Sequence, residues 1–240
     1  MLQMNQITKV YRTELVETHA LRALDLHVAE GEFVAVTGPS GSGKTTFLNI
    51  AGLLEEFTGG EYVLDGENVR GLNDDARSRL RNRKIGFIFQ SFNLIPDLNL
   101  FDNVDVPLRY RGMSAAERRQ RIEKALADVG LASRMKHYPA ELSGGQQQRA
   151  AIARALAGSP RLLLADEPTG NLDSQMARGI MELLEEINAA GTTIVMVTHD
   201  PELAARAQRN VHIVDGVATD IRHASPLMGR AGAAAAEARV

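Results

Sequence analysis

The sequence predicts an α/β protein whose core is a mostly parallel β-sheet, with an N-terminal antiparallel β region and an inserted helical lobe. Three observations lead to this prediction. A glycine-rich loop at Gly38–Thr45 stands between an apolar strand and a helix, as in phosphate-binding α/β units. Short apolar strands alternate with helices in the second half of the chain, which is typical of a parallel sheet covered on both faces. A charged, helical stretch at about residues 91–158 interrupts that order.

The first thirty residues are predicted to form strands, because hydrophobic and polar residues alternate along them. A turn is expected at Glu30-Gly31, and Asp65-Gly66 is typical of a hairpin turn. The predicted strands and hairpin arms are Leu2–Val10, Leu21–Ala29, Phe33–Thr37, Glu61–Val69 and Lys84–Phe89, with one helix at Thr45–Leu54.

The helical lobe begins at Ser91, and Ser114–Glu117 forms a capping box ahead of a charged helix. Gly130 stands where that helix should end. After these helices we expect a helix at Gly145–Ala157, a strand at Arg161–Ala165, a helix at Ser174–Ala190, a strand at Thr192–Val197 and a hairpin at Val211–Ala218. Residues 1–222 are therefore predicted to form one domain. The alanine-rich tail at 223–240, a frayed helix or a disordered segment, is given no function.

Composition excludes several classes of function. The chain has 27 basic and 30 acidic residues, a net charge of −3, whereas proteins that bind nucleic acid need a clustered basic excess. There is no cysteine, which excludes disulfides, thiolate catalysis and cysteine-bearing metal sites. We see no signal peptide at the start and no run of eighteen apolar residues, so this chain is not expected to span a membrane by itself.

Two segments have more than one interpretation. The basic run from Arg77 to Lys84 is first interpreted as a solvated face, and second as a contact with a partner or a lipid headgroup. The segment Ser91–Val106 carries apolar residues that form either the core of the lobe or a surface for a partner helix. These apolar residues are Phe92, Leu94, Ile95, Leu98 and Phe101.

The glycine-rich loop is the first candidate site, because it matches the phosphate-binding pattern G-x-x-x-x-G-K-[ST]. Glycines allow a tight turn in which consecutive N–H groups point at a polyphosphate, and the following helix presents its positive end to the same anion. Lys44 adds a charge near the β- and γ-phosphates, and Thr45 offers a hydroxyl to Mg²⁺. The alternative is a glycine-rich turn without a ligand.

Asp166 and Glu167 form the second half of such a site. Asp166 ends an apolar strand, where its carboxylate can hold the Mg²⁺ that Thr45 also binds. Successive side chains of a strand point in opposite directions, so we expect Glu167 to face a water molecule aligned with the γ-phosphate. Without the glycine loop, this pair would equally well mark the boundary between a strand and a loop.

Leu142–Gln146, with the sequence Leu-Ser-Gly-Gly-Gln, has the properties of a helix start that a serine caps and that exposes amide groups to an anion. These residues match the signature motif of ATP-binding cassette (ABC) proteins at every position. Over residues 1–222 the sequence resembles the nucleotide-binding subunit of an ABC transporter. The resemblance implies the ABC ATPase fold, an ATPase activity, and a head-to-tail dimer in which Ser143 and Gly145 of one copy close over the ATP held by Lys44 of the other.

The same resemblance assigns further residues. Tyr11 is expected to stack on adenine, Gln90 to sense Mg²⁺ and report to a membrane partner, and His199 to contact the γ-phosphate. The implied ATP contacts are Tyr11, Gly38, Pro39, Ser40, Gly41, Ser42, Gly43, Lys44, Thr45, Thr46 and Gln90. The implied Mg²⁺ ligands are Thr45, Gln90 and Asp166, and the implied catalytic residues are Lys44, Glu167 and His199. The contacts implied across the dimer come from Ser143, Gly144, Gly145, Gln146 and Asp173.

Three stretches resemble most the MacB/LolD branch, which covers macrolide or peptide exporters and lipoprotein-releasing complexes. They are Gln90–Pro96, Leu142–Arg149 and Ala165–Asp173. The branch implies a membrane permease, a periplasmic adaptor, and a peripheral position on the cytoplasmic face of the inner membrane. MacB-type exporters often fuse the ATPase to the membrane domain, but no spanning helix is expected in this chain, so we expect the permease to be a separate chain. Two alternatives remain, a subunit that drives transmembrane signalling in cell division and a non-transport ABC protein. The cargo lies outside this sequence.

Overall fold

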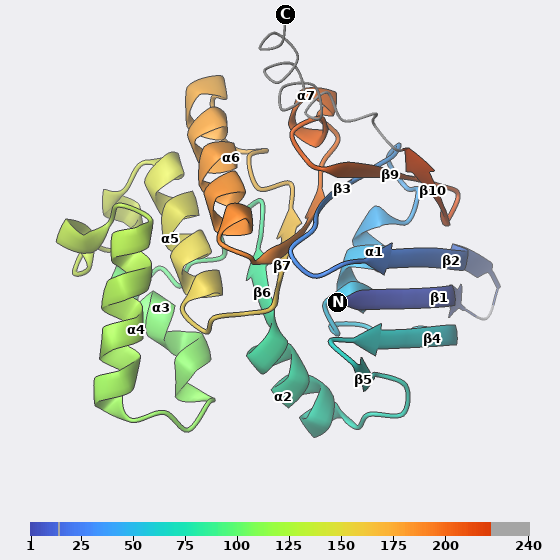
Figure 1. Cartoon of the computed structure of the whole chain (residues 1–240), viewed down its shortest axis with the longest axis horizontal. Helices are drawn as coiled ribbons and strands as arrows, with labels where there is room; N and C mark the ends of the chain where they lie inside the picture. Colours follow the sequence, from blue (N-terminus) through green and yellow to red (C-terminus); the bar gives the residue numbers. More distant parts are fainter. Residues whose placement is uncertain (14, 222–240) are drawn as a thin grey trace, which may run out of the picture.

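A computed structural model describes residues 1–13 and 15–221, and in it two sheets and a group of helices lie side by side (Figure 1). The tail predicted at 223–240 lies outside the described residues. In chain order the elements are β1 (Leu2–Arg12), β2 (Glu17–Val28), β3 (Phe33–Thr37), α1 (Lys44–Ala51), β4 (Gly59–Leu64), β5 (Glu67–Asn68), α2 (Asp74–Lys84), β6 (Ile85–Ile88), α3 (Leu100–Arg109), α4 (Ala115–Asp128), η1 (Ala132–Arg134), η2 (Pro139–Glu141), α5 (Gly144–Leu156), β7 (Leu162–Asp166), α6 (Ser174–Ala189), β8 (Thr193–Val197), α7 (Pro201–Ala204), β9 (Arg209–Val214) and β10 (Val217–Ile221).

The larger sheet has the strand order β10-β9-β3-β8-β7-β6. Strands β9, β3, β8, β7 and β6 run parallel, and β10 pairs with β9 in the antiparallel sense. This confirms the mostly parallel sheet that the sequence predicts. Because these strands share one direction, the loops that follow β3, β8, β7 and β6 all leave the sheet at the same edge, where α/β proteins bind their ligands.

Side chains of the central strands alternate between two hydrophobic cores. Phe33 and Ala35 of β3 belong to the core beneath the helical lobe, whereas Val34 and Val36 belong to the core shared with the smaller sheet. Strands β7 and β8 divide their residues in the same way, as the two-residue period of a strand requires. The sheet is thus packed on both faces, which fixes its strand ends relative to one another.

The smaller sheet is antiparallel, with the order β2-β1-β4-β5, and it confirms the predicted N-terminal β region. Its apolar residues share a core with Phe47 and Ile50 of α1. The hydroxyl of Tyr62, which is fully buried, donates a hydrogen bond of 2.7 Å to the carbonyl of Ala51 at the end of α1. The small sheet therefore supports the helix that follows the glycine-rich loop.

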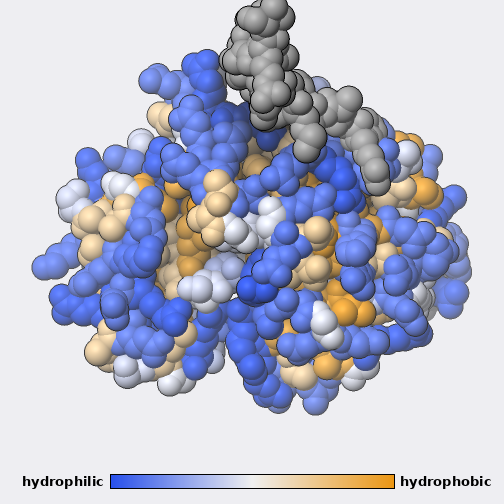
Figure 2. Space-filling model, viewed as in Figure 1, coloured by the Kyte–Doolittle hydropathy of each residue, from blue (hydrophilic) through white to orange (hydrophobic). Residues whose placement is uncertain are grey.

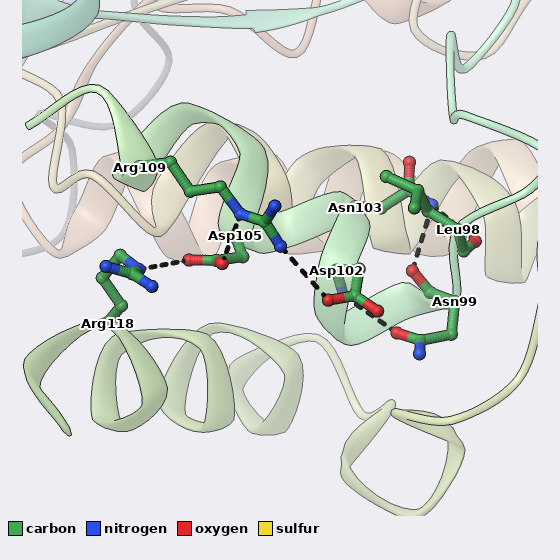
Figure 3. Close-up of polar contacts among 7 residues, drawn as sticks. All are labelled: Leu98, Asn99, Asp102, Asn103, Asp105, Arg109 and Arg118. Atoms are coloured by element: carbon green, nitrogen blue, oxygen red, sulfur yellow. Dashed lines mark hydrogen bonds and ion pairs between the residues drawn. The ribbon is translucent and has the colours of Figure 1, made fainter. Parts of the chain in front are cut away.

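The helical lobe contains α3, α4 and α5, which lie on the opposite side of the larger sheet from β1, β2 and β4 (Figure 1). Figure 3 shows the polar contacts that hold α3 and the loop before it. Asp105 is only 4% exposed and accepts hydrogen bonds from Arg109, on its own helix, and from Arg118 of α4, at 2.7 and 2.8 Å. A buried carboxylate is tolerated when it is paired in this way. This ion pair joins α3 to α4.

Three predictions need correction: a helix boundary, a capping box and the environment of the basic run. Helix α1 ends at Ala51 instead of Leu54, because the chain turns at Gly52. The predicted box at Ser114–Glu117 is only half formed: Ser114 caps α4, but the carboxylate of Glu117 pairs with Arg121. The basic run that was first interpreted as a solvated face is part of helix α2, on which Arg77 and Lys84 are partly buried and form ion pairs.

Hydrophilic residues cover most of the face shown in Figure 2, and apolar residues lie in patches between them. None of the helices in the described residues is long and apolar enough to cross a lipid bilayer.

Candidate functional site

The glycine-rich loop joins the end of β3 to the start of α1, and its glycines are required by geometry. Gly38, Gly41 and Gly43 have φ angles of 147°, 76° and 102°, a region that other residues rarely adopt. A β-carbon on Gly38 would lie 2.1 Å from the carbonyl oxygen of Ile213, and one on Gly43 would lie 2.5 Å from that of Ala20. The loop can therefore keep this shape only with glycine at both positions.

The interior of the loop is polar. The ammonium group of Lys44 donates hydrogen bonds to the carbonyl oxygens of Gly38 and Pro39, at 2.8 and 2.7 Å. Within the described residues the hydroxyl of Ser42 is buried without a hydrogen-bond partner, and no side chain caps the N-terminus of α1. A charged lysine, a buried hydroxyl and free helix N–H groups suit a polyphosphate ligand. These observations fit the predicted ATP phosphates.

Asp166 ends β7, two strands from β3 in the sheet, at the same edge as the glycine loop. Burial raises the pKa of Asp166, the charge of Glu167 raises it further, and the charge of Lys44 lowers it. Asp166 and Lys44 are thus near enough to interact. A carboxylate oxygen and the exposed hydroxyl of Thr45 are hard oxygen ligands of the kind that Mg²⁺ prefers. The donor set fits the predicted magnesium ion.

The reason given for the direction of Glu167 does not apply, and whether its carboxylate faces the attacking water stays a prediction. Strand β7 ends at Asp166, so the alternation of strand side chains does not extend to Glu167, which has a left-handed φ of 45°. Its N–H group donates to the carbonyl oxygen of Val197 at 2.9 Å, and its Oε1 lies 2.8 Å from Nδ1 of His199. This hydrogen bond and the negative charge of Glu167 raise the pKa of His199. The two residues come from the ends of neighbouring strands β7 and β8, and the sheet brings them together.

Gln90 follows β6 at the same edge, and its neighbours are residues of the loop after β7. Its amide nitrogen lies 3.4 Å from the side-chain oxygen of Asn171, whose own amide donates to the backbone carbonyl of Gln90 at 2.9 Å. A β-carbon on Gly170 would lie 2.7 Å from the Gln90 amide nitrogen. The side chain of Gln90 is therefore directed at this loop, and its role as a Mg²⁺ ligand stays a prediction.

The Leu-Ser-Gly-Gly-Gln segment begins helix α5, as expected, with Ser143 as the N-cap. The Ser143 hydroxyl accepts from the N–H of Gln146 at 3.4 Å, and Gln146 Oε1 accepts from the N–H of Ser143 at 3.0 Å, a complete capping box. A β-carbon on Gly145 would lie 3.0 Å from the sulfur of Met176, a tight contact, whereas one on Gly144 would meet Leu172 at an ordinary 3.4 Å. Among the described residues, no hydrogen bond or ion pair joins this segment to the glycine-rich loop of the same chain.

Two other predicted ligands have partners within the chain. The carboxylate of Asp173 caps α6 by accepting from the N–H groups of Gln175 and Met176, at 3.0 and 2.8 Å, so the predicted contact across a dimer stays untested. Tyr11 lies on β1, 41% exposed, and Lys9 lies over its ring at 4.9 Å. Partial burial and Glu55 raise the pKa of Tyr11. Tyr11 is thus only partly exposed, and the predicted adenine contact stays a prediction.

Sequence reasoning missed three side chains that hold this edge of the sheet. Asn171 positions Gln90, Gln148 donates to the carbonyl of Pro168, and Arg154 donates to the carbonyls of Phe92 and Asn93 just after Gln90. A polar residue within a helix or loop carries no sequence signal of such a contact, because its partner lies far away along the chain.

Known proteins were compared with this chain. The sequence profile described as ABC transporter matches residues 21–170, which include the glycine-rich loop, Gln90, Leu142–Gln146 and Glu167. This chain belongs to the ABC transporter family. Its fold, a P-loop α/β core with a β subdomain and a helical subdomain, is the fold of an ABC ATPase cassette.

Individual relatives agree with the family. YknY of Bacillus subtilis, an uncharacterized ABC transporter ATP-binding protein, is 49% identical over 216 residues, which are 90% of this chain and 94% of YknY. The macrolide export ATP-binding/permease protein MacB of Azoarcus sp. is 47% identical over 216 residues, 90% of this chain but 33% of MacB. The ATP-binding cassette MJ0796, in a dimeric post-hydrolysis structure bound to ADP and phosphate, is 43% identical with a TM-score of 0.83, over 93% of this chain and all of that one.

Proposed function

We propose that this chain binds ATP with Mg²⁺ and hydrolyses it to ADP and phosphate, and that this reaction energises an ABC transporter. The observation that carries the proposal is one edge of the sheet at which Lys44 lies within the glycine loop, near Asp166, while Glu167 lies against His199. Phosphate binding, metal binding and proton transfer are thereby collected in one place.

Each residue has a distinct task in this reaction. Lys44 and the loop N–H groups offset the charge of the β- and γ-phosphates. The Glu167 carboxylate accepts a hydrogen bond from the attacking water and takes its proton, and His199 orients that carboxylate or contacts the γ-phosphate. Bound Mg²⁺, held by Thr45 and Asp166 and, as the family resemblance implies, by Gln90, would neutralise charge on the transferred phosphoryl group.

A second copy of the chain would complete the site. Ser143, Gly144, Gly145 and Gln146 lie at the partly exposed start of α5, and among the described residues none of them bonds to the glycine-rich loop of their own chain. Placed over the γ-phosphate held by the second copy, this helix start adds N–H groups and a positive dipole end where the loop leaves the phosphate open. The dimeric structure of MJ0796 with ADP and phosphate supports a dimer, and the head-to-tail arrangement is part of our proposal.

Two variants test the chemistry. Lys44→Ala should weaken ATP binding and abolish phosphate release. Glu167→Gln should bind ATP but stall before hydrolysis, because glutamine has the shape of glutamate but cannot act as a base. Lys124→Ala and Glu123→Gln, which change exposed side chains on α4, are matched controls expected to behave like the wild type. Nucleotide binding and phosphate release are measured for all four. Robust turnover by Glu167→Gln would remove Glu167 from the role of base.

The membrane partner is an integral-membrane permease, and a groove between α2 and the helical lobe is the proposed docking site. The groove measures about 1330 Å³ and is lined by α2, β6, α3 and the end of α5. The lining combines apolar and aromatic side chains, such as Phe87 and Tyr110, with seven cationic side chains. Among the described residues, only two acidic ones, Glu67 and Asp75, line it. A helix with apolar and acidic side chains fits this lining. The cationic side chains are Arg79, Arg81, Arg83, Lys84, Arg111, Arg154 and Arg161.

The two interpretations of Ser91–Val106 each apply to part of it. Leu94 and Phe101 pack against the core of the lobe, whereas Ile95 is 41% exposed. Asn103, which is fully buried, bonds the backbone of Ile95. It also donates to the carbonyl oxygens of Leu98 and Asn99, and these two contacts are drawn in Figure 3. The loop is thereby a preorganised platform beside the groove.

The charge of the groove can be tested with the transporter complex. Arg79→Glu and Arg83→Glu should keep the basal ATPase activity of the isolated chain, and so should the control Arg119→Glu, which changes an exposed residue of α4 that does not line the groove. The two groove variants should co-purify less permease from detergent and lose cargo-stimulated turnover. Wild-type recovery of the permease by both groove variants would place the docking surface elsewhere.

Similarity to the macrolide export ATP-binding/permease protein MacB supports export as the coupled process. The periplasmic adaptor and the position on the cytoplasmic face of the inner membrane remain predictions from the sequence. Lipoprotein release and signalling remain predictions from the sequence. The cargo that stimulates ATP hydrolysis in the reconstituted complex distinguishes them: a macrolide or peptide for export, a lipoprotein for release, and neither for signalling.

A further inference from the structure

Gln148 is a buried amide in the helix that begins with the signature residues. It lies five residues after Ser143, about 7.5 Å along α5, and its side chain has no exposed surface. Its amide nitrogen donates a hydrogen bond of 2.5 Å to the carbonyl oxygen of Pro168. Among the described residues its amide oxygen has no partner. Burying an amide oxygen without a hydrogen-bond partner costs free energy, so the burial of this glutamine calls for an explanation. The position of its partner offers one, because Pro168 directly follows Glu167.

The backbone at Glu167 is in a conformation that must be held from outside. Its φ of 45° is rare for a residue with a side chain, and the proline that follows disfavours it further. Two hydrogen bonds flank the strained residue: the Glu167 N–H donates to Val197 on one side, and Pro168 accepts from Gln148 on the other. The direction of the Glu167 carboxylate toward His199 depends on both.

We propose that Gln148 is a positioning residue that fixes the Glu167 carboxylate from helix α5. The inference rests on the proposed role of Glu167 as the base. Its consequence is a link between two ATP sites: the start of α5 faces the ATP of the second copy, while Gln148, on the same helix, holds the base for the ATP of its own chain. When two copies close over ATP, a shift of α5 would move the Glu167 carboxylate through the hydrogen bond from Gln148 to Pro168.

Two substitutions test the donor. Gln148→Met keeps the length of the side chain but cannot donate, so the kcat for ATP hydrolysis should fall roughly ten- to a hundredfold, while KM for ATP changes by less than about threefold because the glycine loop is untouched. Gln148→Glu can donate only when protonated, and burial raises the pKa of such a carboxyl group. Its kcat relative to that of the wild type should therefore rise as the pH is lowered.

Asn188→Leu is the matched control for the loss of a buried amide. Asn188 bonds the carbonyls of Gly31 and Thr192 at the opposite edge of the sheet, so this variant should be less stable but keep its kcat. The wild type and Glu167→Gln are assayed in parallel: turnover by Glu167→Gln would remove the proposed base itself, whereas the proposal for Gln148 fails separately if folded Gln148→Met keeps kcat within about twofold of the wild type. If Gln148→Met does not fold, a relative kcat of Gln148→Glu that is independent of pH overturns the proposal.

Discussion

Replacing Gly170 by alanine should displace Gln90 without removing any of its atoms. The added β-carbon would lie 2.7 Å from the amide nitrogen of Gln90 and 3.1 Å from its Cδ, closer than packed atoms allow. Gly170 does not have a left-handed φ, so alanine fits its backbone without strain. The only atoms in the way are the far end of a flexible side chain, which will move.

The cost in stability should be small. Gln90 would lose one long hydrogen bond, 3.4 Å to Asn171, which is worth about 0.5–1.5 kcal/mol at most. In a chain of this size, 1 kcal/mol corresponds to a decrease of roughly 2–4 °C in Tm. The effect on turnover should be larger, because a displacement of about 1 Å near reacting groups can cost up to about a hundredfold. We expect kcat to fall about tenfold or more.

Steady-state ATPase kinetics and thermal unfolding of Gly170→Ala, Gln90→Ala and the double variant test this reasoning. Gly179→Ala is the control, because its β-carbon would meet only the side chain of Arg149, at 3.4 Å. In the middle of α6, alanine should stabilise the helix by about 0.5–1 kcal/mol relative to glycine. If Gly170→Ala acts through Gln90, the kcat of the double variant should be no lower than that of the less active single variant. Wild-type kcat for Gly170→Ala, or fully additive losses in the double variant, would refute the argument.

Two further predictions concern stability. In urea unfolding, Gly43→Ala should lose more stability than Gly41→Ala. Both substitutions put alanine at a positive φ, which costs about 1–3 kcal/mol, but only at Gly43 does the new β-carbon also meet backbone, 2.5 Å from the carbonyl oxygen of Ala20. Equal losses of stability would contradict the packing of the loop. His199→Gln should lower Tm only at low pH. The pKa of His199 is raised by Glu167, so the stabilisation is fully present below about pH 6.5 and disappears as pH rises through the raised pKa; a Tm difference that grows with pH contradicts the pairing of His199 with Glu167.

The sequence predicts those features that depend on local patterns. Alternation gives the strands, the glycine spacing gives the phosphate loop, and the shared direction of parallel strands is enough to expect Asp166 near Lys44. The start of α5 was predictable because Ser143 and Gln146 are three residues apart. Helix α2 also carries a signal, the N-cap Asn73 followed by two acidic residues, but with Leu80 as its only fully buried residue it shows no apolar face.

The arrangement of the catalytic groups could not be predicted. Glu167 leaves the strand in a left-handed conformation, so the two-residue period of β7 does not determine its direction. Gln90 and Gln148 bond to Asn171 and Pro168, residues that belong to another segment of the chain. Such contacts arise when the sheet and the helical lobe pack together, and no spacing within either segment encodes them.

The size of the Glu167→Gln protein with and without ATP tests the central claim most directly. Each complete site needs Lys44 from one copy and the Ser143 end of α5 from another, and the substitution prevents hydrolysis from breaking the complex. Light scattering should show a monomer without nucleotide and a dimer with ATP and Mg²⁺, and adding Lys44→Ala to the same chain should prevent the dimer. A protein that stays monomeric in ATP, or that is dimeric whether or not ATP is present, would contradict the shared site.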